Sequence, residues 1–167
     1  MKVSIVYSSK TGNTKLLAQT IMSCFDKEDV VYCGEMNNTV IDAERIFVGF
    51  WTDKGTCDEK VAEFLKGLHG KQVFLFGTAG FGGSEIYFQQ ILERVMAHLD
   101  DSNQVVGSYM CQGKMLNGVR DRYVALQKEH PEDPKYEKMI LMFDHALTHP
   151  DQDDLEKLKQ LIQESNQ

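Results

Sequence analysis

The chain has 167 residues, of which 42% are hydrophobic and 26% charged, and its formal net charge is −7 at pH 7. This length predicts one domain over residues 1–167 with a substantial core, while the absence of a long apolar stretch or signal peptide predicts a cytoplasmic protein without membrane partners. The acidic balance argues against a nucleic-acid partner and favours docking to a basic protein surface.

Apolar runs alternate with segments of helical spacing along most of the chain. The predicted order is a strand at 2–7, a helix at 14–25, strands at 29–34 and 44–51, a helix at 58–68, a strand at 73–76, a helix at 86–99 and a strand at 104–109. The near-continuous apolar run at 73–76 is typical of a strand buried on both faces. Five strands with helical crossovers indicate an α/β fold, with a doubly wound parallel sheet between two layers of helices.

A hydroxyl-rich turn connects the first strand to the first helix. It reads Tyr-Ser-Ser-Lys-Thr-Gly-Asn-Thr over residues 7–14. Helix N-termini bind anions because their first N–H groups lack partners and the helix dipole is positive there. The turn has neither the Gly-Lys-Ser/Thr of a Walker loop nor the three glycines of a dinucleotide-binding turn. It therefore predicts a monophosphate pocket built mainly from neutral donors, with an ordinary helix cap as the alternative.

Two more loops follow predicted strands and pair an aromatic residue with glycines or small polar residues. The loop after the third strand contains Trp51, Thr52 and Gly55, and the loop after the fourth runs from residue 77 to 84 and contains Phe81. A planar, hydrogen-bonding heterocycle needs an aromatic face to stack against and a backbone that its polar edge can approach. In doubly wound sheets the ligand lies at the carboxyl ends of the strands, where these loops meet.

The three loops resemble the flavin-binding loops of flavodoxins. The first matches the family pattern Ser/Thr-x-Thr-Gly-x-Thr, Trp51 stands where the family commonly has a Trp, and residues 77–80 match its Gly-Thr/Ser-x-Gly stretch. The resemblance implies the family's sheet order 2-1-3-4-5 and bound flavin mononucleotide (FMN); neither follows from spacing. It assigns to FMN Ser9, Lys10, Thr11, Gly12, Asn13, Thr14, Trp51, Thr52, Gly55, Thr78, Ala79, Gly80, Phe81 and Gly82.

Details of the second and third loops depart from the family or admit a second interpretation. Phe81 is the nearest candidate for the aromatic that stacks on the flavin in the family's third loop, with Tyr87 as a second candidate. Gly82 and Gly83 occupy the place where the family usually has an acidic residue. Cys57, at the start of the next helix, would need a lowered pKa to act as a redox thiol.

The chain departs from a short flavodoxin after the fifth strand. An insert at about 111–148 precedes the last predicted helix, 151–163, and contains a predicted helix at 136–147. An insert of this length at the ligand face is either a lid or docking element, or a helical extension that merely covers the sheet.

The resemblance implies electron transfer by FMN between a reductase and an acceptor protein, performed by a monomer or weak dimer without catalytic residues. Cys-x-x-Cys and His-x-x-x-His spacings are absent, so no metal site is expected. One alternative is a flavin-dependent reductase of a quinone, a tetrapyrrole or another small molecule, with Lys114, Arg120 and Arg122 holding an acidic substrate. A second alternative is a non-flavin binding module on the same fold.

Overall fold

The computed structural model describes residues 1–37, 42–82 and 84–167, so Gly83 lies outside the described residues. Its centre is a five-stranded parallel sheet in the order β2-β1-β3-β4-β5. The strands are β1 (Val3–Tyr7), β2 (Val30–Glu35), β3 (Arg45–Trp51), β4 (Gln72–Ala79) and β5 (Gln104–Gln112). The predicted α/β fold and the family's sheet order are both confirmed.

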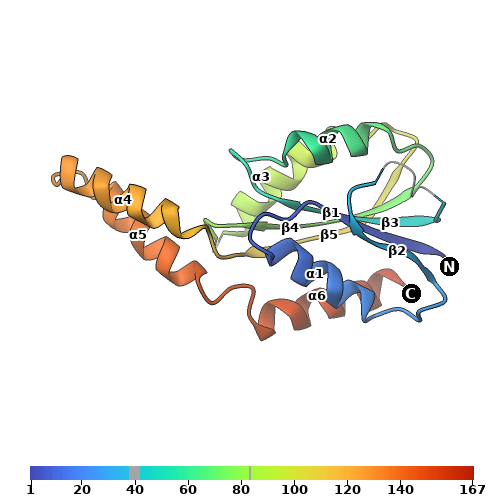
Figure 1. Cartoon of the computed structure of the whole chain (residues 1–167). Coiled ribbons are helices and arrows are strands. Elements are labelled where there is room, and N and C mark those ends of the chain that lie inside the picture. Colours follow the sequence, from blue (N-terminus) through green and yellow to red (C-terminus); the bar gives the residue numbers. More distant parts are fainter. Residues whose placement is uncertain (38–41, 83) are drawn as a thin grey trace.

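Two pairs of helices cover the two faces of the sheet (Figure 1). One face carries α1 (Asn13–Met22) and α6 (Gln152–Ser165), and the other carries α2 (Glu59–Lys66) and α3 (Glu85–Met96). Because helices cover both faces, the central strands β1 and β3 are apolar almost throughout and buried. In the described part of the chain, no helix combines the length and apolarity needed to cross a bilayer.

The insert forms a helical hairpin that projects from the carboxyl end of the sheet (Figure 1). It consists of α4 (Asn117–Glu129) and α5 (Lys135–Ala146), which pack chiefly on each other. The helix predicted at 136–147 is confirmed by α5, but α4 was not predicted. Only Tyr123 of α4 is buried, so this helix lacks the wide apolar stripe by which helices are recognised. The last strand also extends beyond its predicted end at 109, as far as Gln112.

Each glycine near the middle of β3, β4 or β5 lies directly opposite a phenylalanine of a neighbouring strand. The pairs are Gly49 with Phe76, Gly77 with Phe50, and Gly107 with Phe74. A Cβ atom on any of these glycines would lie 2.4–2.7 Å from the facing ring. The phenylalanine rings therefore occupy the space that a side chain would need, and they fill the core above the glycines.

Gly77→Ala is expected to lower the free energy of unfolding by about 1–3 kcal/mol, because the new methyl group overpacks the core against Phe50. The matched control is Gly118→Ala in α4, where a Cβ would meet no atom within 4 Å. That change should stabilise by about 0.4–1 kcal/mol through reduced freedom of the unfolded chain. Urea denaturation measures both, and equal effects of the two changes would contradict the packing argument.

Candidate functional site

The turn between β1 and α1, residues 9–14, is closed around one hydroxyl group. Gly12 precedes the helix with φ 90°, a left-handed conformation that favours glycine. The N–H groups of Gly12 and Lys15 donate to the Ser9 Oγ at 3.2 and 3.4 Å. Donors at the start of α1 thus converge on a single oxygen, in an arrangement that also suits an oxygen of a phosphate group.

Asn13 and Thr14, the first two residues of α1, are both buried, and their side chains bond to protein groups. The Thr14 hydroxyl donates to the Phe50 carbonyl at 3.2 Å, so it faces the sheet. The Asn13 Nδ2 donates to the Lys114 carbonyl at 2.8 Å and ties the turn to the start of the insert. The first turn of the helix therefore directs the Thr14 hydroxyl towards the sheet.

A pocket of about 430 Å³ lies where the loops at the carboxyl ends of the strands meet the insert. We call it the loop-end pocket. The predicted site residues that line it are Lys10, Thr11, Asn13, Trp51, Thr52, Thr78, Ala79, Gly80 and Phe81. The predicted residues Ser9, Gly12, Thr14, Gly55 and Gly82 do not line it. The structure therefore brings residues of all three predicted loops into one cavity.

Asp58 holds the indole of Trp51 in place. The Trp51 Nε1 donates to the Asp58 Oδ2 at 3.1 Å, and the Ser8 hydroxyl donates to the same oxygen at 2.7 Å. The other oxygen of Asp58 accepts the Val61 N–H at 3.0 Å and caps α2. Sequence reasoning identified Asp58 only as a helix start. The Lys10 Nζ lies 4.9 Å from the Trp51 ring centroid, within cation–π range.

A tight turn follows β3 and places Lys54 on the rim of the loop-end pocket. Asp53 and Thr56 form an isolated antiparallel bridge, and the two residues between them have positive φ, 52° at Lys54 and 84° at Gly55. Two positive φ angles define a type I′ turn. The Gly55 carbonyl accepts from the Arg94 Nη1 at 2.9 Å, and this bond ties the turn to α3.

The start of the insert and α4 form the remaining wall of the pocket, of which the sequence analysis had named only Lys114 and Arg122, as possible holders of an acidic substrate. The lining residues on this side are Gly113, Lys114, Met115, Leu116, Val119, Arg122 and Tyr123. Glycines allow the close approach, since a Cβ on Gly80 would lie 2.5 Å from the Met115 Cγ and one on Gly113 2.4 Å from the Asn13 Nδ2. The available signal was position, because the insert begins directly at the carboxyl end of β5.

The flavodoxin domain family matches residues 4–163. The chain belongs to this family. It is 37% identical to the flavodoxin-like domain-containing protein BilS of Clostridium symbiosum (strain WAL-14163), over 93% of this chain and 90% of that protein. It is 33% identical to the BilS protein of Clostridioides difficile (strain CD3), with the same two coverages.

Solved flavodoxin structures share the fold at low sequence identity. Oxidised flavodoxin 2 from Bacillus cereus aligns with a TM-score of 0.61 at 19% identity, over 99% of this chain and 98% of that chain. A flavoprotein in complex with FMN from Lactobacillus acidophilus aligns with a TM-score of 0.51 at 16% identity, over 66% of this chain and 93% of that chain.

Only two of the three basic residues predicted to hold an acidic substrate, Lys114, Arg120 and Arg122, lie at the pocket of this flavodoxin domain. Arg120 forms a bidentate pair with Asp144, at 2.9 and 3.2 Å, and joins α4 to α5. The bonds from this guanidinium lower the pKa of the Asp144 carboxyl. Lys114 and Arg122 line the loop-end pocket, so only these two of the trio can meet a ligand there. Tyr87, the second stacking candidate, lies on α3, is partly buried and packs against the core.

Gln112 connects the loop after β4 to the hairpin. Its Nε2 donates to the Gly80 carbonyl at 3.0 Å, and its Oε1 lies 2.8 Å from the His145 Nδ1. A Cβ on Gly82 would lie 2.8 Å from three atoms of Gln112. Gly82, which was predicted to bind FMN, thus gives Gln112 room to reach the Gly80 carbonyl.

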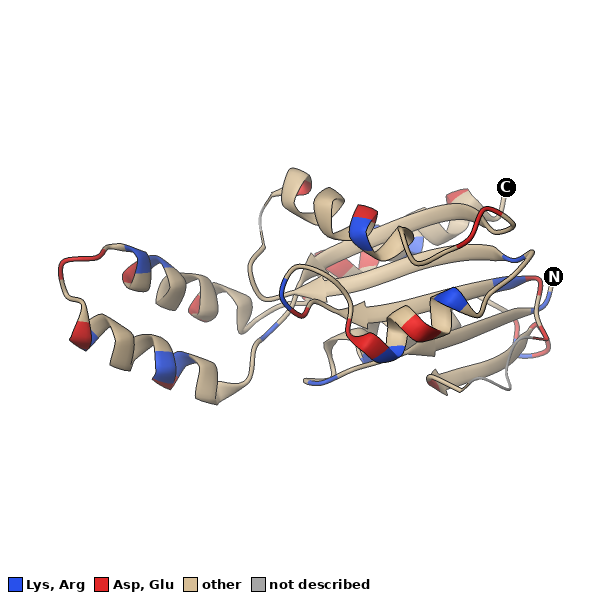
Figure 2. Cartoon of the chain, turned by 90° about the horizontal axis from the view of Figure 1, so that it is seen from above, with Lys and Arg blue, Asp and Glu red and all other residues tan. Residues whose placement is uncertain are grey.

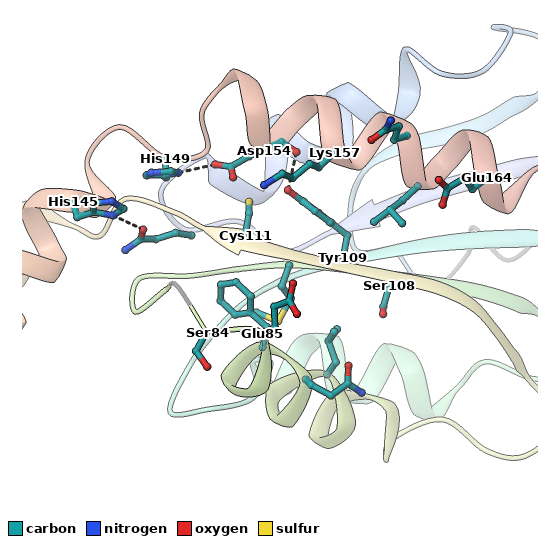
Figure 3. A pocket seen from close by; sticks show the side chains of 17 residues that line it. Ser84, Glu85, Ser108, Tyr109, Cys111, His145, His149, Asp154, Lys157 and Glu164 are labelled. Carbon is teal, nitrogen blue, oxygen red and sulfur yellow. Dashed lines mark hydrogen bonds and ion pairs between the residues drawn. The ribbon is translucent and has the colours of Figure 1, made fainter.

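A larger cavity of about 710 Å³ lies along the outer edge of β5, between α3 and α6 (Figure 3). On its α6 side, the His149 Nδ1 lies 2.7 Å from the Asp154 Oδ2, and Asp151 and Asp154 cap the start of α6 reciprocally. Potential metal-ligating atoms of these three residues lie within 4.8 Å of one another, but these helix-capping bonds already account for the cluster.

Burial raises the pKa of two thiols near the ligand face. Cys111 lines the cavity along the outer edge of β5, and Cys57 lies at the start of α2. Desolvation is the largest cause of the pKa shift in both cases. A raised pKa keeps a thiol protonated at neutral pH, whereas a reactive thiol needs the opposite shift. The pKa shift of both thiols is therefore opposite to the one that a redox thiol needs.

Proposed function

We propose that this flavodoxin domain is an electron-transfer protein that holds FMN in the loop-end pocket. The observation that carries the proposal is the convergence of the anion-binding turn, the oriented Trp51 and the loop after β4 on one cavity. Members of the flavodoxin family typically bind FMN, and one structural neighbour is described in complex with it.

The residues that line the pocket fit the parts of FMN. The turn after β1 contributes Lys10, Thr11 and Asn13 to the pocket lining, and of these Thr11 offers its hydroxyl to the phosphate. Trp51, Phe81 and Tyr123 offer aromatic surface to the ring system. The volume of about 430 Å³ lies within the range of roughly 300–1,000 Å³ that small-molecule pockets occupy.

The same lining favours an electron carrier over an enzyme with its own substrate. FMN supplies the transfer of one or two electrons, and the chain binds, orients and shields it. General acid–base catalysis usually depends on a His, Asp or Glu with a supporting partner. Among the described residues, none of the side chains that line the loop-end pocket is a His, Asp or Glu.

The proposal predicts that the purified protein binds FMN and not flavin adenine dinucleotide, because its anion site fits one phosphate. Fluorescence titration with each flavin tests this part. The FMN-loaded protein should then accept electrons slowly from nicotinamide nucleotides alone and rapidly through a flavodoxin reductase, as stopped-flow absorbance would show. Failure to bind FMN would refute the cofactor assignment. Rapid oxidation of nicotinamide nucleotide by the isolated protein would instead favour the alternative that this protein is itself a flavin-dependent reductase.

A further inference from the structure

We infer that the redox partner of this protein presents an acidic surface, which docks on a ring of four cations around the mouth of the loop-end pocket. This inference rests on the proposed function, since it names the kind of partner that the same site serves. The net charge alone predicted the opposite, a partner with a basic surface, because net charge does not record where on the molecule the charges lie.

Charge at the pocket is opposite in sign to the charge of the whole chain. The charged residues that line the pocket are Lys10, Lys54, Lys114 and Arg122, and no carboxylate lines it among the described residues, although the net charge is −7. All four side chains are exposed. Exposed cations gathered in one place steer an acidic partner towards that place.

The four cations are free to meet a partner. Within the described parts of the chain, none of them takes part in an ion pair, and Lys10 contacts the Trp51 ring by a cation–π interaction. Arg120, two residues before Arg122, is by contrast paired with Asp144. The FMN phosphate would bring roughly −1.5 to −2 charges, so about two positive charges stay uncompensated.

The backbone at Lys54 indicates that its charge serves a purpose. With φ 52°, Lys54 occupies the first central position of a type I′ turn, where Asn is strongly preferred. A non-glycine side chain in the left-handed region is disfavoured, and less so for Asn. Strain of this kind is retained mainly at functional sites. A lysine here, with no ion pair to the described residues, is consistent with a contact outside the chain.

The arrangement of the cations favours a protein partner over a small anion. Lys10 follows β1, Lys54 lies in the turn after β3, Lys114 follows β5 and Arg122 lies on α4. The four therefore surround the pocket from separate elements, as a broad docking face does. Figure 2 shows the hairpin projecting beside these loops with charges of both signs, so a protein docked at the pocket would also meet the hairpin.

The test uses the FMN-loaded protein with two probe proteins, an acidic plant-type ferredoxin and a basic cytochrome c. The variants are Lys54→Asn and Arg122→Gln, and the matched control is Lys27→Gln, which removes one exposed lysine between α1 and β2 at the opposite end of the sheet. Electron exchange with ferredoxin should be rapid at low ionic strength and fall with added salt. Each variant should slow it about three- to tenfold, and Lys27→Gln less than twofold.

Two measurements keep this test separate from the proposed function. Lys54→Asn should unfold at the same or a higher temperature than the wild type, because Asn suits the turn, so a slower rate would not reflect damage. Amide NMR shifts on adding ferredoxin, recorded with and without FMN, should cluster around the four cations. FMN binding with unchanged ferredoxin rates in both variants, or shifts elsewhere on the surface, would overturn the acidic-partner inference and leave the FMN assignment standing.

Discussion

Thr11→Val should weaken FMN binding by about 10- to 100-fold, because it removes a hydroxyl donor from the phosphate. A hydrogen bond to a charged group contributes roughly 1.5–3 kcal/mol, and about 1.4 kcal/mol corresponds to a tenfold change in affinity. Thr11 is half-buried and lines the loop-end pocket, so its hydroxyl is available to a ligand. Quenching of FMN fluorescence gives the dissociation constant. Riboflavin, which lacks the phosphate, should bind the variant and the wild type alike.

The matched control is Thr14→Val, which removes the same group three residues along the chain. The Thr14 hydroxyl donates to the Phe50 carbonyl and is fully buried, so this change should cost about 0.5–1.5 kcal/mol of stability by removing that hydrogen bond. FMN affinity, measured where the variant is folded, should change less than threefold. Equal losses of FMN affinity in the two variants would show that Thr14 reorients towards the phosphate, as the family pattern implied.

The contrast between Thr11 and Thr14 shows what sequence reasoning captured at the site. A strand, a hydroxyl-rich turn and a helix are local features, and they located the turn correctly. Which hydroxyl faces the ligand depends on where the helix begins and how it packs. Since α1 starts at Asn13, Thr14 is directed into the sheet and Thr11 stays in the turn. That information comes from packing between α1 and β3, which no local pattern records.

The features that sequence reasoning missed are those that depend on distant contacts. The α4 helix is polar and packs chiefly on α5, so its stability comes from a neighbour rather than from its own pattern. Asp58 was predicted to begin a helix, but its bonds to Ser8 and Trp51 join three separate segments. Net charge is additive and so is known from composition, whereas its reversal at the pocket depends on how the chain folds.

Removing the hairpin should abolish tight FMN binding and leave the α/β domain folded. The Lys114 N–H donates to the His149 carbonyl at 3.0 Å, so the two ends of the hairpin are adjacent. Deleting residues 115–148 and joining the ends through Asn-Gly therefore needs no rearrangement of the sheet. The two helices of the hairpin pack chiefly on each other, so after the deletion α1, α2, α3 and α6 still cover both faces of the sheet. Circular dichroism and urea denaturation would show a cooperative, folded domain.

FMN affinity of the deletion variant should fall more than about 100-fold, because the pocket loses Met115, Leu116, Val119 and Tyr123 from one wall. Burying one such side chain against a ligand contributes about 1.5–3 kcal/mol, so losing two of them suffices. Riboflavin should lose as much affinity as FMN, since apolar and aromatic side chains are expected to pack on the ring rather than on the phosphate. This pattern is the reverse of that expected for Thr11→Val. A folded deletion variant that keeps wild-type FMN affinity would show that the hairpin is no wall of the flavin site, and would confine its role to partner docking.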